Sequence, residues 1–114
     1  MNLKSGDIIT VDFPAVTGVK RRPAVILSSQ TYHNIRPDII IGLITTQTKR
    51  LGMTDYALQD WQSSGLRVAS IFRSFIVTLP SSTNMILIGQ LSDRDWQGVR
   101  GCIKIAFAEL DDLC

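Results

Sequence analysis

The chain has 114 residues, of which 45% are hydrophobic and 19% are charged. This length suits one domain with a modest core, and the apolar content excludes a disordered chain. The net charge of +2 is too small to indicate nucleic-acid binding by itself. We therefore predict a single domain over residues 1–114.

The sequence contains few features that indicate a cellular compartment or a bound cofactor. No signal-peptide pattern precedes the first apolar segment, and apolar runs such as Ile39 to Ile44 are too short to span a membrane. Cys102 and Cys114 have neither metal-ligand spacing nor a disulfide pattern. The single histidine, His33, excludes ribonuclease chemistry that uses two imidazoles. We expect a cytoplasmic protein that has no metal, no cofactor and no membrane contact.

The first part of the chain predicts three strands. Alternation with a period of two predicts a strand over residues 8–13, and continuous apolar runs predict buried strands over residues 24–28 and 39–44. We expect a loop at residues 15–20. Residues 30–38 are polar and predict a connection that contains a short helical turn.

The second part predicts shorter strands and one helix. The strand candidates are residues 56–58, 68–71, 75–79 and 85–91. Ser92 and Asp95 form a helix-start signature, in which the hydroxyl and the carboxylate each serve free amides of the first turn. Apolar residues at spacings of three and four then predict an amphipathic helix; they are Trp96, Val99, Ile103, Ala106 and Leu110. Gly98 and Gly101 each weaken this helix by about 1 kcal/mol relative to alanine. They either permit close packing against another segment or have no special role.

This order of elements predicts a mainly β (α+β) fold. Many short strands followed by a terminal helix indicate a small antiparallel barrel or curled sheet, whose open side the helix covers. A barrel of this size has little core, so a second copy is expected to cover leftover apolar edges.

A cluster of three cations, Lys20-Arg21-Arg22, runs directly into Pro23 and an apolar strand. Pro23 fixes its own backbone angle and favours an extended Arg22. A loop that carries the cations and is anchored by the strand would hold Arg22 at a defined point. The alternative, which composition alone favours, is a solvated basic turn before a core strand.

A second polar cluster, Thr45-Thr46-Gln47, follows the third predicted strand. If the two strands are antiparallel neighbours, this cluster and Arg21-Arg22 lie at the same end of the sheet. Guanidinium donors beside hydroxyl and amide groups can form a phosphate site. Arg22 suits stabilisation of charge on phosphorus, where one preorganised donor contributes roughly 10²–10³ in rate, but it is a poor proton donor. No residue is an obvious general base, and ordinary strand-end threonines that bond a turn are the alternative.

Several short segments carry a resemblance that covers nearly the whole chain. They are Gly6-Asp7-Ile8, Val11-Asp12-Phe13-Pro14, a loop with Gly18, Lys20 to Ser28, Ile44 to Gln47, Gly65-Leu66 with Ser70, Thr78-Leu79, and Ile88 to Ser92. In this order they resemble the MazF/PemK family of bacterial toxin ribonucleases. The Arg-Pro strand followed at this distance by Ile-Thr-x-Gln is the most specific part of the match.

The resemblance implies an SH3-like small β-barrel of the PemK/CcdB type with a C-terminal α-helix, working as a homodimer. It also implies the toxin of a type II toxin–antitoxin system. Such a toxin is a metal-independent, sequence-selective endoribonuclease on single-stranded RNA, an mRNA interferase that inhibits growth. A cognate antitoxin would restrain it, and the complex with the antitoxin would bind DNA.

The resemblance also implies the roles of individual residues. The family's essential arginine before proline falls on Arg22 and its essential threonine on Thr45, so these two are the expected catalytic residues. The expected RNA-binding residues are Lys20, Arg21, Thr46, Gln47, Arg73 and Phe13. Lys20 and Arg21 occupy the loop that in the family moves over RNA and is displaced by antitoxin. Phe13 and Tyr32 are candidates for base stacking, with a place in the core as an equal alternative.

One stretch departs from the family, and it keeps other interpretations open. The run from Arg73 to Thr78 lacks the acidic residue and the arginine that many members carry before the threonine. Arg73 either replaces some of that charge or is a solvated strand residue. The alternatives are a CcdB-like inhibitor of a protein target, whose relatives lack both specific motifs, and a degenerate member that binds antitoxin without cutting RNA.

Overall fold

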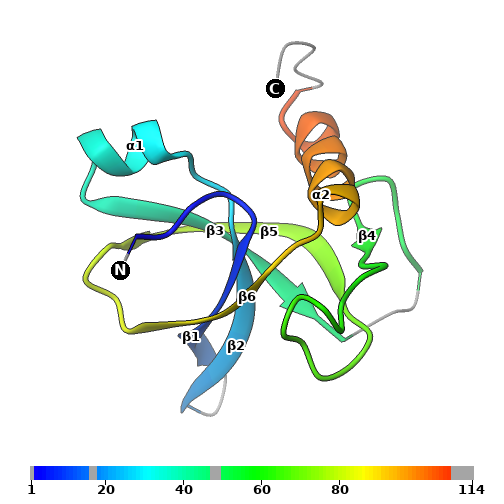
Figure 1. The fold of residues 1–114 in the computed structure, drawn as a ribbon, viewed down its shortest axis with the longest axis horizontal. Coiled ribbons are helices and arrows are strands. Elements are labelled where there is room, and N and C mark those ends of the chain that lie inside the picture. The colour runs from blue at the N-terminus through cyan, green and yellow to red at the C-terminus, as the bar shows by residue number, and fades with distance from the viewer. Residues whose placement is uncertain (1, 16–17, 47–49, 109–114) are drawn as a thin grey trace.

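The computed structural model describes residues 2–15, 18–46 and 50–108, which form one curled sheet and two helices (Figure 1). The elements follow in the order β1 (Asp7–Ala15), β2 (Gly18–Ile26), α1 (Gln30–Ile35), β3 (Asp38–Thr45), β4 (Tyr56–Ala57), β5 (Ile71–Pro80), β6 (Met85–Gln90) and α2 (Asp93–Ala106). No helix within these ranges is long and apolar enough to cross a membrane.

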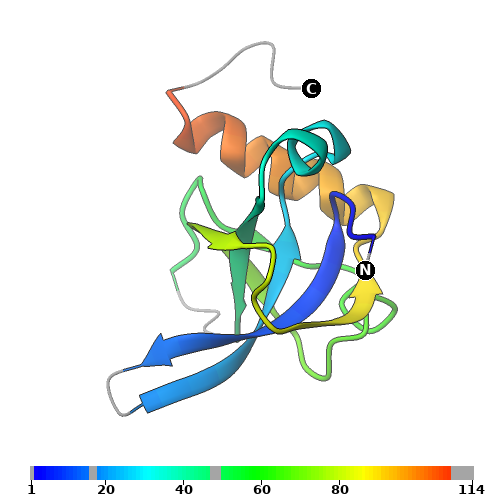
Figure 2. The same cartoon turned by 90° about the vertical axis from the view of Figure 1, so that its left-hand side faces the viewer.

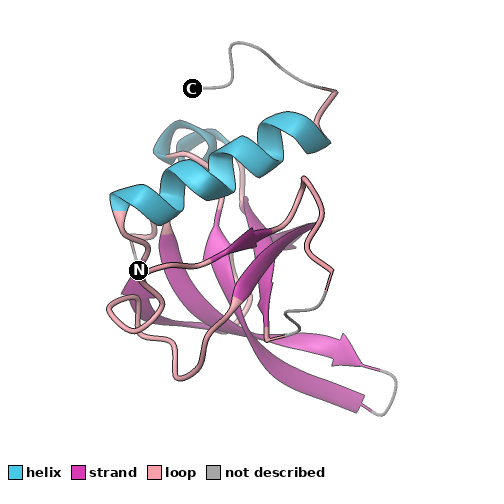
Figure 3. Cartoon of the chain, turned by 90° about the vertical axis from the view of Figure 1, so that its right-hand side faces the viewer, coloured by secondary structure: helices cyan, strands magenta, loops and turns pink. Residues whose placement is uncertain are grey.

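The sheet is antiparallel throughout, in the order β4-β5-β3-β2-β1-β6. It is strongly twisted, and the β1–β2 hairpin extends away from both helices (Figure 2). α2 lies across the sheet at the opposite end from the hairpin tip (Figure 3). The prediction of a mainly β fold with a curled antiparallel sheet and a C-terminal helix is therefore confirmed.

Alternate residues of the central strands contribute to two apolar clusters. The helix-side cluster joins the sheet to α2 and contains Ile8, Val25, Ile44, Leu58, Phe72, Leu91, Val99 and Cys102. The opposite-face cluster contains Leu3, Ile9, Val11, Ala24, Ile26, Ile39, Ile41 and Met85, with Leu43, Val77 and Leu79 packed against it. Because successive strand residues point to opposite faces, cluster membership shows which face each residue occupies.

α2 is attached to the rest of the fold by the buried carboxylate of Asp95. Its oxygens accept hydrogen bonds from the Tyr56 hydroxyl (2.8 Å) and from the amides of Gln59 (2.9 Å) and Asp60 (2.8 Å). Ser92 is the N-cap residue, and its hydroxyl accepts from the Asp95 amide as predicted. The predicted role of the carboxylate is wrong, because its donors lie in β4 and in the turn that follows β4 rather than in the first turn of the helix.

The predicted apolar face of α2 is only partly correct. Val99 is buried and Trp96 and Ile103 are half-buried, but Ala106 is exposed and Leu110 lies outside the described residues. Cys102, which the pattern missed, is buried among the helix-side cluster. The helix crosses the edge of the sheet near β4 and β5, so its last turn extends beyond the surface that it covers.

The loop before β5 lies against β6 through two glycines. A Cβ atom on Gly65 would lie 2.2 Å from the Ile88 carbonyl oxygen, and one on Gly89 would lie 2.1 Å from the Ser64 carbonyl oxygen. Gly65 also has a φ of +87°, which side-chain-bearing residues rarely adopt. Close backbone contact therefore requires glycine at both positions.

Two predicted boundaries are wrong. The expected loop at residues 15–20 overlaps the hairpin, since β1 continues to Ala15 and β2 begins at Gly18. The separate strands expected at residues 68–71 and 75–79 are replaced by one strand, β5, which begins at Ile71 and continues through Arg73 and Ser74. An irregularity in the pairing with β3 accommodates these polar residues without ending the strand.

Candidate functional site

Arg22 lies within β2 and not on a loop, so the expectation of a cation-bearing loop is wrong for this residue. Its backbone is opposite Val11 of β1, in a ladder that runs without interruption from Ile8–Val25 to Ala15–Gly18. The side chain is half-buried. The hydrogen-bonded hairpin therefore holds the backbone of Arg22 in a defined position, with Pro23 fixing the next residue.

Arg22 and Thr45 lie at the same end of neighbouring antiparallel strands. The β2–β3 ladder pairs Ala24 with Leu43 and Val25 with Gly42. It ends next to Pro23, which has no N–H to donate. Extended by two residues, the same register brings Arg22 opposite Thr45. Both alternate onto the face of the opposite-face cluster, and both are half-buried.

Arg21 occupies the other face of the hairpin, where its guanidinium binds β1. Nε donates to the Thr10 hydroxyl (3.1 Å), Nη2 to the Thr10 carbonyl (3.2 Å), and Nη1 to the Asp12 carboxylate (2.9 Å). Lys20, paired with Phe13 through the backbone, is exposed. The three consecutive cations are therefore divided between two faces: Lys20 and Arg22 alternate onto the face of Thr45, and Arg21 occupies the other. Of the two cations on that face, Arg22 is the one in register with Thr45.

The strand next to Thr45 contains a β-bulge. Gly42 pairs with Ile76 and Ile44 with Phe72, so the single residue between them in β3 faces residues 73–75 of β5. The half-buried Arg73 lies two residues beyond Ile71, which is the backbone partner of Thr45. The stretch from Arg73 to Thr78, which lacks the charged residues that the resemblance implies, is thus also irregular in structure.

The remaining predicted site residues are placed as follows. Thr46 is exposed directly after Thr45. Gln47 lies outside the described residues, as does the side chain of Phe13. Tyr32 lines a cavity of about 520 Å³ between α1 and α2, together with Trp96. This cavity is on the helix side of the sheet, so Tyr32 is not brought together with Arg22 and Thr45.

The arrangement is chemically suited to an anion. Arg22 and Thr45 place a guanidinium and a hydroxyl on one face at one end of the sheet, with Lys20 exposed on the same hairpin. A half-buried arginine presents several donors in a planar fork, which matches the oxygens of a phosphate group. Within residues 2–15, 18–46 and 50–108, no three His, Cys, Asp or Glu side chains cluster as metal ligands.

Comparison with known proteins identifies the family. The family model for the PemK-like, MazF-like toxin of type II toxin–antitoxin systems matches residues 4–107. Comparison with curated protein sequences finds no significant match.

Solved structures show the same fold at low sequence identity. The MazE–MazF complex from Deinococcus radiodurans contains a chain with a TM-score of 0.78 and 17% identity, covering 96% of this chain and 100% of that chain. An endoribonuclease in complex with its cognate antitoxin from a mycobacterial species has a TM-score of 0.78 and 17% identity, covering 93% and 95%. The Mycobacterium tuberculosis toxin MazF-mt6 has a TM-score of 0.74 and 21% identity, covering 90% and 96%. With the family model matching most of its length, the chain belongs to the PemK-like, MazF-like family of toxins of type II toxin–antitoxin systems.

Proposed function

We propose that this protein is a growth-inhibiting toxin that cuts single-stranded RNA in the cytoplasm without a metal ion. The observation that supports this most directly is the register of β2 and β3, which pairs Ala24 with Leu43 and, extended by two residues, brings Arg22 opposite Thr45 on one face. Solved relatives of the same fold are described as endoribonucleases, one of them in complex with its cognate antitoxin.

The proposed reaction is attack of a ribose 2'-oxygen on the adjacent phosphorus. The 2'-hydroxyl loses its proton, the bond from phosphorus to the 5'-oxygen breaks, and that oxygen takes up a proton. Negative charge on the non-bridging oxygens increases along this path. The Arg22 guanidinium is proposed to stabilise that charge, and the Thr45 hydroxyl to bind a phosphate oxygen and orient the phosphodiester.

The neighbouring residues are proposed to attract and hold the RNA strand. Lys20 and Arg73 supply positive charge, and Thr46, Gln47 and Phe13 supply contacts beyond the scissile phosphate. Arg21 can bind RNA as proposed only if its guanidinium releases Thr10 and Asp12 and forms hydrogen bonds to a phosphate group instead.

Two protein partners are part of the proposal: a cognate antitoxin and a second copy of the chain. Of β6, the edge strand, Ile86 is 52% exposed and Leu87 is 47% exposed. An exposed apolar edge strand is a ready surface for self-association, which supports a homodimer.

The decisive experiment is cleavage of a long single-stranded RNA by purified protein in EDTA. Arg22→Ala and Thr45→Ala are each expected to lower the cleavage rate by at least about 10². Matched controls are Arg100→Ala, a half-buried arginine on α2, and Thr83→Ala, a half-buried threonine in the β5–β6 turn. Both controls are expected to cut like the wild type.

The stretch from Arg73 to Val77 lacks the charged residues that the resemblance implies, which is a specific reason to test whether the protein is a toxin without nuclease activity. In that case the wild type would leave several RNAs intact in the same assay while still arresting growth. That result would refute the nuclease proposal and favour a CcdB-like inhibitor of a protein target. If neither cutting nor growth arrest occurs but antitoxin binds, the chain is a degenerate member of the family.

A further inference from the structure

The bulge in β5 has an uncommon backbone conformation at its centre. Ser74 has a φ of +57°, in the left-handed region that residues other than glycine seldom occupy. Its hydroxyl donates to the Thr54 carbonyl oxygen at 2.7 Å, which ties the bulge to the segment before β4. Strained backbone that is held in place by a specific bond is concentrated at functional positions, and bulges change the direction of side chains there.

Phe75 is the last residue of the bulge, and its alternation with the next two residues of β5 gives the face of its side chain. Ile76 lines the cavity beside α2, whereas Val77 packs against the opposite-face cluster. Phe75 therefore points away from α2, onto the face that Arg22 and Thr45 share. It lies in the segment opposite Leu43, two residues before Thr45 in β3.

The Phe75 side chain is more exposed to solvent than is favourable for an apolar aromatic ring. Its exposed fraction is 55%, whereas Phe72 in the same strand is fully buried in the helix-side cluster. An aromatic ring held on a rigid strand, beside a proposed phosphate site, has the properties of a stacking platform for an unpaired base.

We propose that Phe75 is an RNA-binding residue on which one base of the bound RNA stacks, next to the phosphate held by Arg22. This proposal rests on the proposed function. In this role the bulge presents the ring, and the hydroxyl of Ser74 maintains the bulge. Because every base has a π-face, the ring contributes affinity at one nucleotide position, while the fit around it decides which base is accepted.

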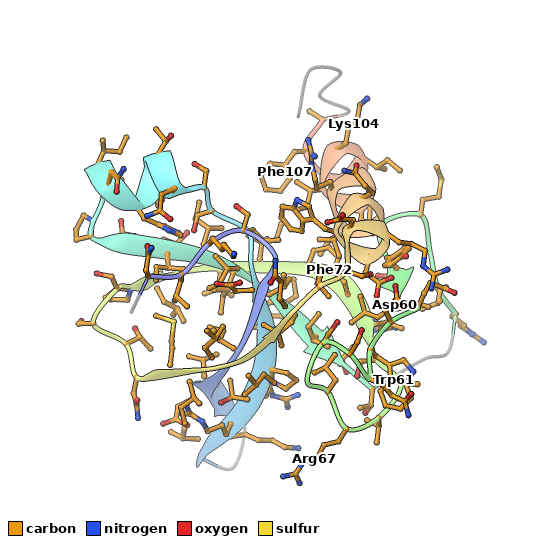
Figure 4. All side chains as sticks on the ribbon, in the orientation of Figure 1. Asp60, Trp61, Arg67, Phe72, Lys104 and Phe107 are labelled. Carbon is orange, nitrogen blue, oxygen red and sulfur yellow. The ribbon has the colours of Figure 1, made fainter. Side chains whose placement is uncertain are left out.

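The test measures binding and cleavage separately. Binding uses a single-stranded oligonucleotide that carries 2'-deoxyribose at the cleavage position, so it cannot be cut. Phe75→Ala and Phe75→Leu are expected to weaken its Kd by roughly 5- to 100-fold, and Phe75→Tyr to stay within about twofold of the wild type. Phe107→Ala removes a ring of similar exposure at the end of α2 (Figure 4) and is expected to leave Kd unchanged.

A series of abasic oligonucleotides supplies the discriminating step. Removing the base that stacks on Phe75 should weaken binding to the wild type but not to Phe75→Leu, whereas removing other bases should affect both proteins equally. If no single position shows this coupling, or if Phe75→Leu binds and cuts like the wild type, the proposal is overturned. Thermal unfolding of Phe75→Leu, which keeps an apolar side chain at this site, separates a loss of binding from a loss of folding. Failure of the wild type to bind or cut any RNA would instead refute the proposed function.

Discussion

Gly98 and Gly101 lie one turn apart on α2, and the structure predicts opposite effects for the same substitution. A Cβ atom on Gly98 would lie 2.2 Å from Cε1 and 2.3 Å from Cζ of Tyr56, whereas a Cβ atom on Gly101 would have no neighbour within 4 Å. The Tyr56 ring cannot move aside freely, because its hydroxyl donates to the buried Asp95 carboxylate at 2.8 Å.

The expected magnitudes follow from these contacts. Overpacking at Gly98 costs about 1–3 kcal/mol, and displacement of Tyr56 would remove a hydrogen bond to a buried carboxylate, worth about 1.5–3 kcal/mol. The higher helix propensity of alanine relative to glycine offsets about 1 kcal/mol of this cost. Gly98→Ala is therefore expected to lower the free energy of unfolding by about 1.5–5 kcal/mol. Gly101→Ala should raise it by up to about 1 kcal/mol.

Urea denaturation followed by far-UV circular dichroism measures both variants under the same conditions. The Tyr56→Ala background supplies the internal control, because Gly98→Ala should become neutral or stabilising once the ring is absent. If Gly98→Ala and Gly101→Ala shift stability in the same direction, or if Gly98→Ala is equally harmful without the ring, the packing argument is refuted.

Three further predictions concern the buried contacts that hold the fold. Asp95→Asn should lower the free energy of unfolding by about 2–3 kcal/mol, since the amide NH₂ that replaces one carboxylate oxygen would face at least one backbone N–H donor. Exposed Asp93→Asn should change it by less than about 1 kcal/mol, and equal effects of the two variants in urea denaturation would contradict this. Burial, and then the hydrogen bond to Asp95, raise the pKa of Tyr56 to about 12. The neutral hydroxyl is therefore favoured in the folded chain, and its stabilisation is complete below pH about 10 and is lost as the pH rises toward about 12. Denaturation midpoints should fall more steeply over that range in the wild type than in Tyr56→Phe, and parallel curves would disprove the assignment. Gly65→Ala and Gly89→Ala should each destabilise the fold by at least about 2 kcal/mol, because the new Cβ would lie 2.2 Å or 2.1 Å from a backbone carbonyl oxygen. Thermal unfolding near that of the wild type would show that the loop and β6 separate easily.

Sequence reasoning succeeded where the pattern is local. The period-two alternation of residues 8–13 and the short apolar run of residues 39–44 each favour a buried strand, and the structure has β1 and β3 there. The Ser92 cap and the spacing of Trp96 and Val99 likewise identify α2, because capping and helical periodicity act between residues a few positions apart.

Long-range pairing decided the features that local patterns leave open. The sequence places Arg21 and Arg22 side by side, but a strand sends them to opposite faces, and only the register with β1 shows that Arg21 binds Thr10 and Asp12. The bulge at residues 73–75 exists only relative to β3, so the exposure of Phe75 could not be deduced from neighbours in the chain.

Local sequence patterns were therefore enough to identify most of the strands, the terminal helix, and the cations and threonines from which a site could be built. The folded chain shows which of those side chains share a face, and where the Asp95 carboxylate finds its donors. It also shows that a Cβ atom at Gly98 would overlap Tyr56, whereas one at Gly101 would have no neighbour within 4 Å. The physical reason is that strand periodicity and helix capping depend on adjacent residues. Register, bulges and close packing depend on contacts between segments tens of residues apart, which one strand's sequence does not encode alone.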